Sequence, residues 1–115
     1  NELKQAVNHY KKARKTTELL LSFYRDLNGS FRGLDARIPR EMDSKGREAQ
    51  VLLSKTNLRL AALYRRQNQS EVAVPLLVEV VKLMSPTKAE GQKAYQSLLE
   101  LGFVETPYAG MRKTN

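Results

Sequence analysis

Two rows of basic residues are the candidate functional side chains of this sequence. One row consists of Lys4, Lys11 and Lys15 with Asn8, and the other consists of Lys55, Arg59 and Arg66. Spacings of three, four and seven place the members of each row on one face of a helix. The chemistry available to them is the binding of anionic groups. If the two helices pack together, the rows frame a groove for an acidic peptide; otherwise they are two separate solvated faces.

The sequence offers few residues for catalysis or metal binding. The chain has no Cys and a single His, His9, so thiol nucleophiles, disulfides, Cys-ligated zinc and paired histidine ligands are excluded. The carboxylates Asp35, Glu41 and Asp43 alternate with basic residues, and we expect local ion pairs among them. We therefore predict no enzyme, no metal and no cofactor.

The positive charge is confined to one half of the chain. The net charge is +8, and residues 1–66 hold 15 Lys and Arg against 7 Asp and Glu, whereas residues 67–115 hold 5 of each sign. Such a surface suits an acidic protein, an anionic lipid or a nucleic acid, or serves only solubility. Nucleic-acid binding would profit from exposed aromatic platforms, but the chain has no Trp and we place Tyr10 and Tyr24 on an apolar face. An electrostatic RNA- or DNA-binding helical domain is therefore the alternative prediction.

No segment has the composition of a membrane span. The longest apolar run, Val72 to Val78, is far shorter than the roughly 18 residues that a span needs. We predict a soluble intracellular protein, cytoplasmic or organellar. The chain begins at Asn1 without Met, so an anchor or targeting segment could precede it.

Hydrophobic periodicity predicts an all-α fold, an antiparallel stack of about four helices in a single domain. The predicted ranges are 2–28, 44–67, 71–84 and 88–101 within a domain of residues 1–105, followed by a loose tail at 106–115. In the first helix we expect one buried face that carries Ala6, Tyr10, Ala13, Thr17, Leu20, Tyr24 and Leu27. The third helix is apolar on almost every side, so we place it at the centre of the stack.

Local signals set these boundaries. Asn28-Gly29 is expected to close the first helix. The second helix could begin at Pro39, but Gly46 lowers helix propensity nearby, so we prefer a start at Asp43 or Ser44. We expect Ser70 to cap the third helix, Pro75 to bend it, and Thr87 to Glu90 to form a capping box for the fourth.

Residues 54–87 resemble one tetratricopeptide repeat, a helical hairpin of 34 residues. The residues that carry the resemblance are Leu60, Ala61 and Tyr64 on the first helix, Ala73 and Leu77 on the second, and the closing Pro86. Asn57 stands where the family commonly has an aromatic residue, and Val80 stands where it usually has Ala.

The resemblance implies a right-handed superhelical stack or a small bundle in which the flanking helices cover a single hairpin. It also implies that the inner positions of the hairpin are Lys55, Leu58, Ala62 and Arg65, which suit a peptide with an apolar middle and acidic flanks. The Lys, Asn and Arg pattern with which some family members hold a C-terminal carboxylate is not present here.

We therefore predict a non-enzymatic adaptor or assembly factor that presents a basic groove to an acidic and apolar peptide or protein. A regulatory domain of an enzyme that uses the same groove is a third possibility. The predicted partner-binding residues are Lys55, Leu58, Arg59, Ala62, Arg65, Arg66, Lys4, Lys11 and Lys15.

Overall fold

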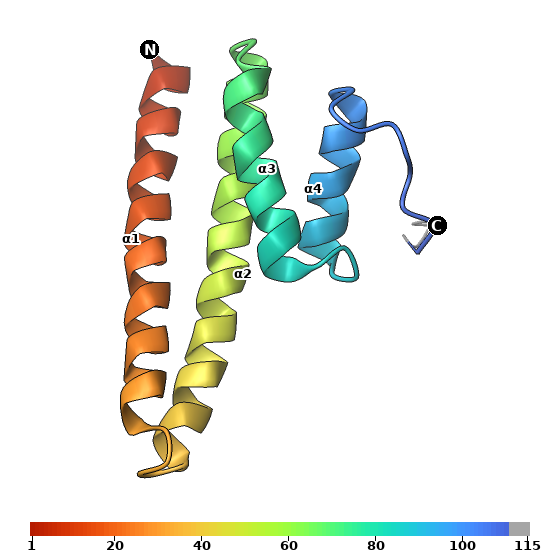
Figure 1. The fold of residues 1–115 in the computed structure, drawn as a ribbon. Coiled ribbons are helices and arrows are strands. Elements are labelled where there is room, and N and C mark those ends of the chain that lie inside the picture. Colours follow the sequence, from red (N-terminus) through yellow and green to blue (C-terminus); the bar gives the residue numbers. More distant parts are fainter. Residues whose placement is uncertain (111–115) are drawn as a thin grey trace.

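The structure is a computed structural model that describes residues 1–110. These residues form four helices and contain no strand (Figure 1). The helices are α1 (Glu2–Phe31), α2 (Arg37–Arg66), α3 (Ser70–Met84) and α4 (Ala89–Glu100). Each helix packs on the next in sequence, and α4 also contacts α2. The predicted all-α stack is confirmed. The end of the predicted tail, residues 111–115, lies outside the described residues.

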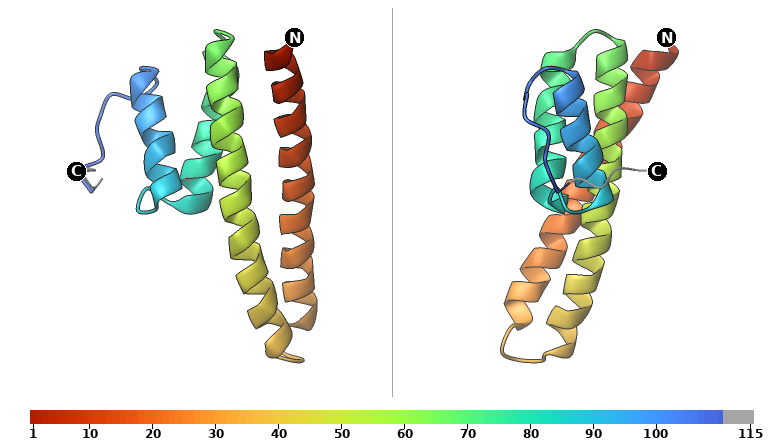
Figure 2. Two further views of the ribbon diagram at one scale, coloured as in Figure 1. Left: turned by 180° about the vertical axis from the view of Figure 1, so that it is seen from behind. Right: turned by 90° about the vertical axis from the view of Figure 1, so that its right-hand side faces the viewer.

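The hydrophobic core is divided unequally along the molecule. The larger cluster joins all four helices and contains Val7, Leu60, Ala61, Ala73, Leu76, Leu77, Val80, Ala94 and Leu98. Its centre is α3, where Leu77 is 1% exposed and Val80 is fully buried, in agreement with the central position predicted for this helix. The second cluster contains only Leu21, Ala49 and Leu53. Leu83 of α3 packs against this cluster, so the cluster lies beside the end of α3, next to the part of the hairpin that extends beyond α3 and α4 (Figures 1 and 2).

The long hairpin of α1 and α2 is held by a seam with a seven-residue repeat. The buried and half-buried seam residues are Val7, Tyr10, Arg14, Thr17, Leu21, Tyr24 and Asn28 of α1 and Met42, Gly46, Ala49, Leu53, Thr56, Leu60 and Leu63 of α2. Alternating steps of three and four are typical of helices that pack as a coiled coil.

The predicted buried face of α1 is therefore wrong at Leu20 and Leu27. Leu20 and Leu27 are 37% and 45% exposed, while their neighbours Leu21 and Asn28 are buried. The prediction favoured apolar residues, but the seam accepts a polar Asn28 because its side chain finds partners on α2.

A network of polar side chains joins three helices beside the main core. Asn57 of α2 is fully buried, and its Oδ1 accepts a hydrogen bond from Arg14 Nε of α1 at 3.0 Å. Its Nδ2 donates to Glu79 Oε1 and to the carbonyl oxygen of Leu76, both on α3. Arg14 Nη2 completes the network with a 2.9 Å ion pair to the same Glu79 oxygen. The polar atoms of Asn57 are thus satisfied, as burial requires.

Two helix boundaries differ from the predicted ones. α1 continues through Gly29 to Phe31, and the left-handed residue that follows it is Gly33, with φ 85°. α2 begins at Arg37, seven residues before the predicted start, and includes Pro39 and Gly46. Pro39 needs no N–H partner in a first turn. Burial of the neighbouring seam residues Met42 and Ala49 offsets the low propensity of Gly46.

The start of α4 does not form the predicted capping box. Lys88 is the N-cap residue and makes no side-chain cap hydrogen bond. The Thr87 hydroxyl instead lies 3.0 Å from that of Ser85, the residue that ends α3. Likewise, Ser70 is the first residue of α3 rather than its cap, and α3 runs through Pro75 as one helix.

The segment that follows α4 is attached to it, and residue 106, the first of the predicted tail, takes part in this attachment. The backbone N–H of Phe103 donates to the carbonyl of Leu98, and Val104 packs against the main core. Further along, the hydroxyl of Tyr95 donates to the carbonyl of Thr106. Residues 103–108 therefore return along α4.

Replacement of Leu77 by Ala tests the central position of α3. The side chain is almost fully buried, so its loss should lower the free energy of unfolding by about 2 to 5 kcal/mol. Urea unfolding followed by circular dichroism gives this quantity. Val72→Ala, at a position 39% exposed on the same helix, is the control. An equal loss in both variants would contradict the assignment.

Replacement of Asn57 by Ala tests the polar network. The substitution leaves Arg14 and Glu79 without their shared partner and opens a small cavity, so we expect the free energy of unfolding to fall by about 2 to 4 kcal/mol. If the network is the cause, Asn57→Ala and Glu79→Ala combined should lose less than the sum of the single losses. Strict additivity in this double-mutant cycle would show that the contacts do not act together.

The start of α2 should respond to acid. The backbone N–H and the guanidinium of Arg37 both donate to the carboxylate of Asp35, and these bonds hold the pKa of Asp35 below its ordinary value of 3.8. A lowered pKa in the folded state stabilises the fold above the unfolded value, and this contribution is lost as the pH falls through the folded value. Carboxyl carbon shifts should give a titration midpoint below 3.8 that rises in Arg37→Ala. The same midpoint in both proteins would refute the pairing.

Candidate functional site

A groove of about 1060 Å³ lies between α2 and α4. Its α2 wall carries Lys55, Leu58, Arg59 and Ala62. The last three lie three, four and seven residues after Lys55, so all four share one helix face. In the left view of Figure 2, α2 lies in front of α3, and α4 stands beside this pair. α4 contacts both of these helices. α3 packs on α2 and on α4 and thereby sets their separation.

The opposite wall comes from α4 and from the segment that follows it. α4 contributes Ala89, Gln92, Lys93, Gln96, Ser97, Leu99 and Glu100, and the returning segment contributes Pro107 and Tyr108. The side chains of Leu58 and Leu99 are half-buried, while Ala62 and Tyr108 are exposed. The groove thus offers an apolar strip between polar edges.

The charge of the groove is positive. Lys55, Arg59 and Lys93 are exposed, and none of them forms an ion pair within residues 1–110. The carboxylate among the lining residues, Glu100, is paired with Arg65 at 3.2 Å. Three cations therefore face the groove without a neutralising carboxylate in its walls.

The structure brings together part of the predicted site. Lys55, Leu58, Arg59 and Ala62 all line the groove. Arg65 stands at its edge, where its pairing with Glu100 links α2 to α4. The exposed Arg66 lies outside the lining, although it shares a helix face with Arg59.

The two basic rows do not line a common groove. Lys4, Lys11 and Lys15 are exposed on α1 and contribute nothing to the groove walls. They lie toward the side of α1 on which Arg14 reaches Glu79 of α3. α1 approaches the α2 row only through Tyr10, whose hydroxyl accepts a 3.5 Å hydrogen bond from Arg59.

The contribution of α4 was missed by the sequence prediction, although the sequence holds a signal for it. The α2 positions Lys55, Leu58, Arg59 and Ala62 recur 34 residues later as Ala89, Gln92, Lys93 and Gln96, and all eight line the groove. The buried seam behind them repeats in the same way, since Asn57 and Leu60 correspond to Gly91 and Ala94, which are also buried. Of the four pairs, Arg59 and Lys93 share their charge, so the signal is the 34-residue spacing that the tetratricopeptide resemblance implies and not a repeat of side chains.

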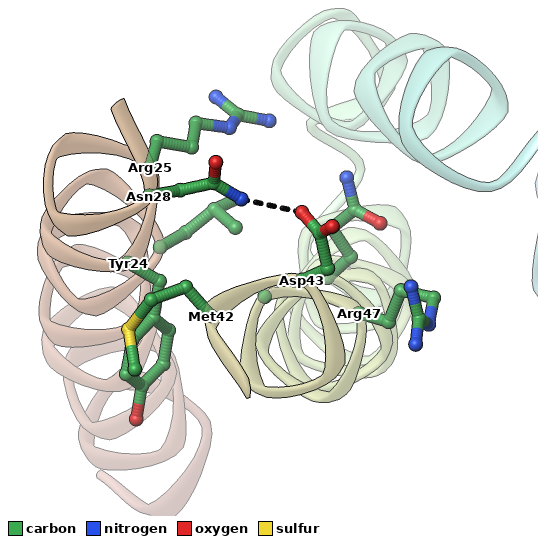
Figure 3. A pocket seen from close by; sticks show the side chains of 9 residues that line it. Tyr24, Arg25, Asn28, Met42, Asp43 and Arg47 are labelled. Atoms are coloured by element: carbon green, nitrogen blue, oxygen red, sulfur yellow. Dashed lines mark hydrogen bonds between the residues drawn. The ribbon is translucent and has the colours of Figure 1, made fainter. Parts of the chain in front are cut away.

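A smaller pocket of about 190 Å³ lies between α1 and α2 near the end of the hairpin (Figure 3). Asn28 Nδ2 donates to the Asp43 carboxylate and to the carbonyl oxygen of Pro39, and its Oδ1 accepts from Arg32. Arg25 and Arg47 flank this bridge from the two helices. The pocket is the polar closure of the hairpin. Of the predicted local ion pairs, Asp35 with Arg37 is formed, whereas Asp43 bonds to Asn28.

Two further findings bear on the sequence predictions. Within the described residues, no three His, Asp or Glu side chains are grouped so that they could hold a metal ion. None of the four helices combines the length and the apolar character that crossing a bilayer demands.

Comparison of the chain with protein-family models, with curated proteins and with solved structures found no match. The four-helix stack is compatible with a helical hairpin repeat, and the tetratricopeptide resemblance stays a prediction that rests on the residues named above.

Proposed function

We propose that this protein is a non-enzymatic interaction module that binds an acidic, partly apolar segment of another protein in the groove between α2 and α4. The observation that carries the proposal is the meeting of Lys55, Arg59 and Lys93 around Leu58 and Leu99. Unpaired cations at an apolar strip favour a ligand that brings carboxylates and a few apolar side chains.

The shape of the groove supports a peptide rather than a small molecule. Its volume of about 1060 Å³ is at the upper end of small-molecule sites, and it is an open channel between two helices. The charges stand on both walls, with Lys55 and Arg59 on α2 and Lys93 on α4. An extended or helical segment of several residues can reach all three.

The tetratricopeptide resemblance adds to this proposal. In that family the first helix of each hairpin lines the inner face, and here α2 and α4 hold those positions with residues that are 34 apart. On this reading α3 is the outer helix of the one complete hairpin, and α4 begins the next. A peptide-binding adaptor or assembly factor is the activity that such a module would have.

The binding of designed peptides tests the proposal. A peptide of about ten residues with an apolar middle and Asp or Glu at both flanks, labelled with Trp, can be followed by fluorescence because the protein contains no Trp. Lys55→Glu with Arg59→Glu should weaken binding at least about tenfold, since each reversal replaces attraction by repulsion. Lys11→Glu with Lys15→Glu makes the same change in net charge on the row outside the groove and should leave the affinity nearly unchanged.

The same titration separates this proposal from nucleic-acid binding. Phosphate contacts make the logarithm of the affinity fall steeply and linearly with the logarithm of the salt concentration. A peptide whose apolar residues are buried keeps most of its affinity at high salt. Equal loss in the two charge-reversed variants, together with tighter binding of single-stranded RNA than of peptide, would refute the proposed function.

A further inference from the structure

The half of the hairpin beyond α3 and α4 leaves large apolar side chains uncovered. There α1 and α2 form a pair of helices without a third (Figures 1 and 2). Where this stretch meets the end of α3, the seam buries Leu21, Ala49 and Leu53, with Tyr24 of α1 and Leu83 of α3 partly buried against them. Leu20, Phe23 and Leu27 of α1 are nevertheless 37%, 56% and 45% exposed. Exposed apolar residues gathered in this way mark an interaction surface more often than isolated ones do.

These three residues form a second stripe along α1. Their spacing of three and four matches that of the seam beside it, so they share one helix face. Leu52 of α2, 52% exposed, adjoins this stripe. Leu20 and Leu52 each precede by one residue the pair Leu21 and Leu53, which pack together. In antiparallel helices, one step back along each chain turns both side chains toward the same side of the pair. We call Leu20, Phe23, Leu27 and Leu52 the hairpin patch.

The hairpin patch is continuous with the groove. Leu52, Lys55, Arg59 and Ala62 follow one another at steps of three, four and three, so they occupy a single face of α2. Leu52 belongs to the patch, and the other three line the groove. The exposed face of α2 therefore joins an apolar surface at one end to a basic one at the other.

We propose that the segment bound by the protein is an amphipathic helix that lies across this face, with its acidic end over Lys55 and Arg59 and its apolar end on the hairpin patch. The inference rests on the proposed function and deepens it. A third helix would bury the second stripe of α1 in the way that the seam buries the first, which is the usual arrangement of helical bundles.

Charge complementarity selects this occupant over a second copy of the chain. Leu20, Phe23 and Leu27 are uncharged, and the two charged residues between them, Arg25 and Asp26, are of opposite sign. The cations among Leu52, Lys55, Arg59 and Ala62 are Lys55 and Arg59. A second copy would bring the same excess of basic charge, since residues 1–66 hold 15 Lys and Arg against 7 Asp and Glu. An acidic helix supplies the opposite charge. From Leu27 through Leu20 and on from Leu52 to Ala62 the surface is about 25 Å long, so it accommodates a helix of roughly 17 residues.

Two peptides distinguish this inference from the proposed function. The short peptide is the acidic one designed for the groove, and the long peptides extend it, at either end, by two turns of a Leu-rich amphipathic helix. We expect one of the long peptides to bind at least about tenfold more tightly than the short one, and to gain helical circular dichroism on binding. If the short peptide binds and neither long peptide binds more tightly, the inference is overturned and the proposed function stands. If no peptide binds, both fail.

Matched variants locate the added contact. Leu52→Asp should abolish the advantage of the long peptide over the short peptide when both are measured with this variant. Leu19→Asp is the control, because Leu19 is 51% exposed but lies on the side of α1 opposite the seam. Leu20→Asp provides a second test on α1, with thermal melting to verify that each variant is folded. Loss of the advantage in Leu19→Asp but not in Leu52→Asp would contradict the inference. Concentration-dependent dimers that Leu52→Asp dissolves would also contradict it, because a second copy would then cover the patch.

Discussion

The buried amide of Asn57 is the constraint on which the arrangement of the first three helices depends. Its acceptor oxygen is used by Arg14 of α1, and its donor nitrogen by Glu79 and the Leu76 carbonyl of α3. An apolar seam tolerates small slips along the helix axis, but a buried polar group does not, because a slip would leave it without a partner. Asn57 thus fixes the register of α1 and of α3 against the same point on α2. The groove depends on this register, because Lys55, Leu58 and Arg59 lie close to Asn57 in the sequence and on other faces of α2.

Polar residues in the seam also explain why apolar residues are exposed on α1. The seven-residue repeat places Arg14 and Asn28 toward α2, where they bond to Asn57 and to Asp43. The same rotation of the helix turns Leu20 and Leu27 away from α2. A helix one position out of phase would bury these leucines, but it would lose the partners of both polar side chains. The exposure of Leu20 and Leu27 is therefore a consequence of the hydrogen bonds that Arg14 and Asn28 form with α2. A helix bound over these leucines would remove their apolar surface from water, which is favourable.

The polar seam residues of α1 also show what the sequence could and could not predict. Helical periodicity was sufficient for the number of helices, for the central place of α3 and for the face of α2 that carries Lys55 to Ala62. It misplaced the stripe of α1 because Arg14 and Asn28 become acceptable seam residues only through partners that lie 43 and 15 positions away. The start of α2 was placed too late because tertiary packing at Met42 and Ala49 outweighs the local propensity of Gly46. Half of the groove was missed because α4 was expected only to flank the central hairpin, and no binding residue was assigned to it.

The width of the groove is set by contacts outside it. α2 and α4 touch only slightly, so their separation depends on how each packs against α3 and on the turn between α3 and α4. In the first turn of α4, Gly91 lies so close to the backbone of Ser85 that a Cβ at this position would overlap the Ser85 carbonyl oxygen. Glycine therefore lets the first turn of α4 approach the end of α3, and the next two residues, Gln92 and Lys93, line the groove. At the other end, the ion pair of Arg65 with Glu100 spans the two helices directly. Gly91 and the Arg65–Glu100 pair thus fix α4 at its two ends, against α3 at one end and against α2 at the other.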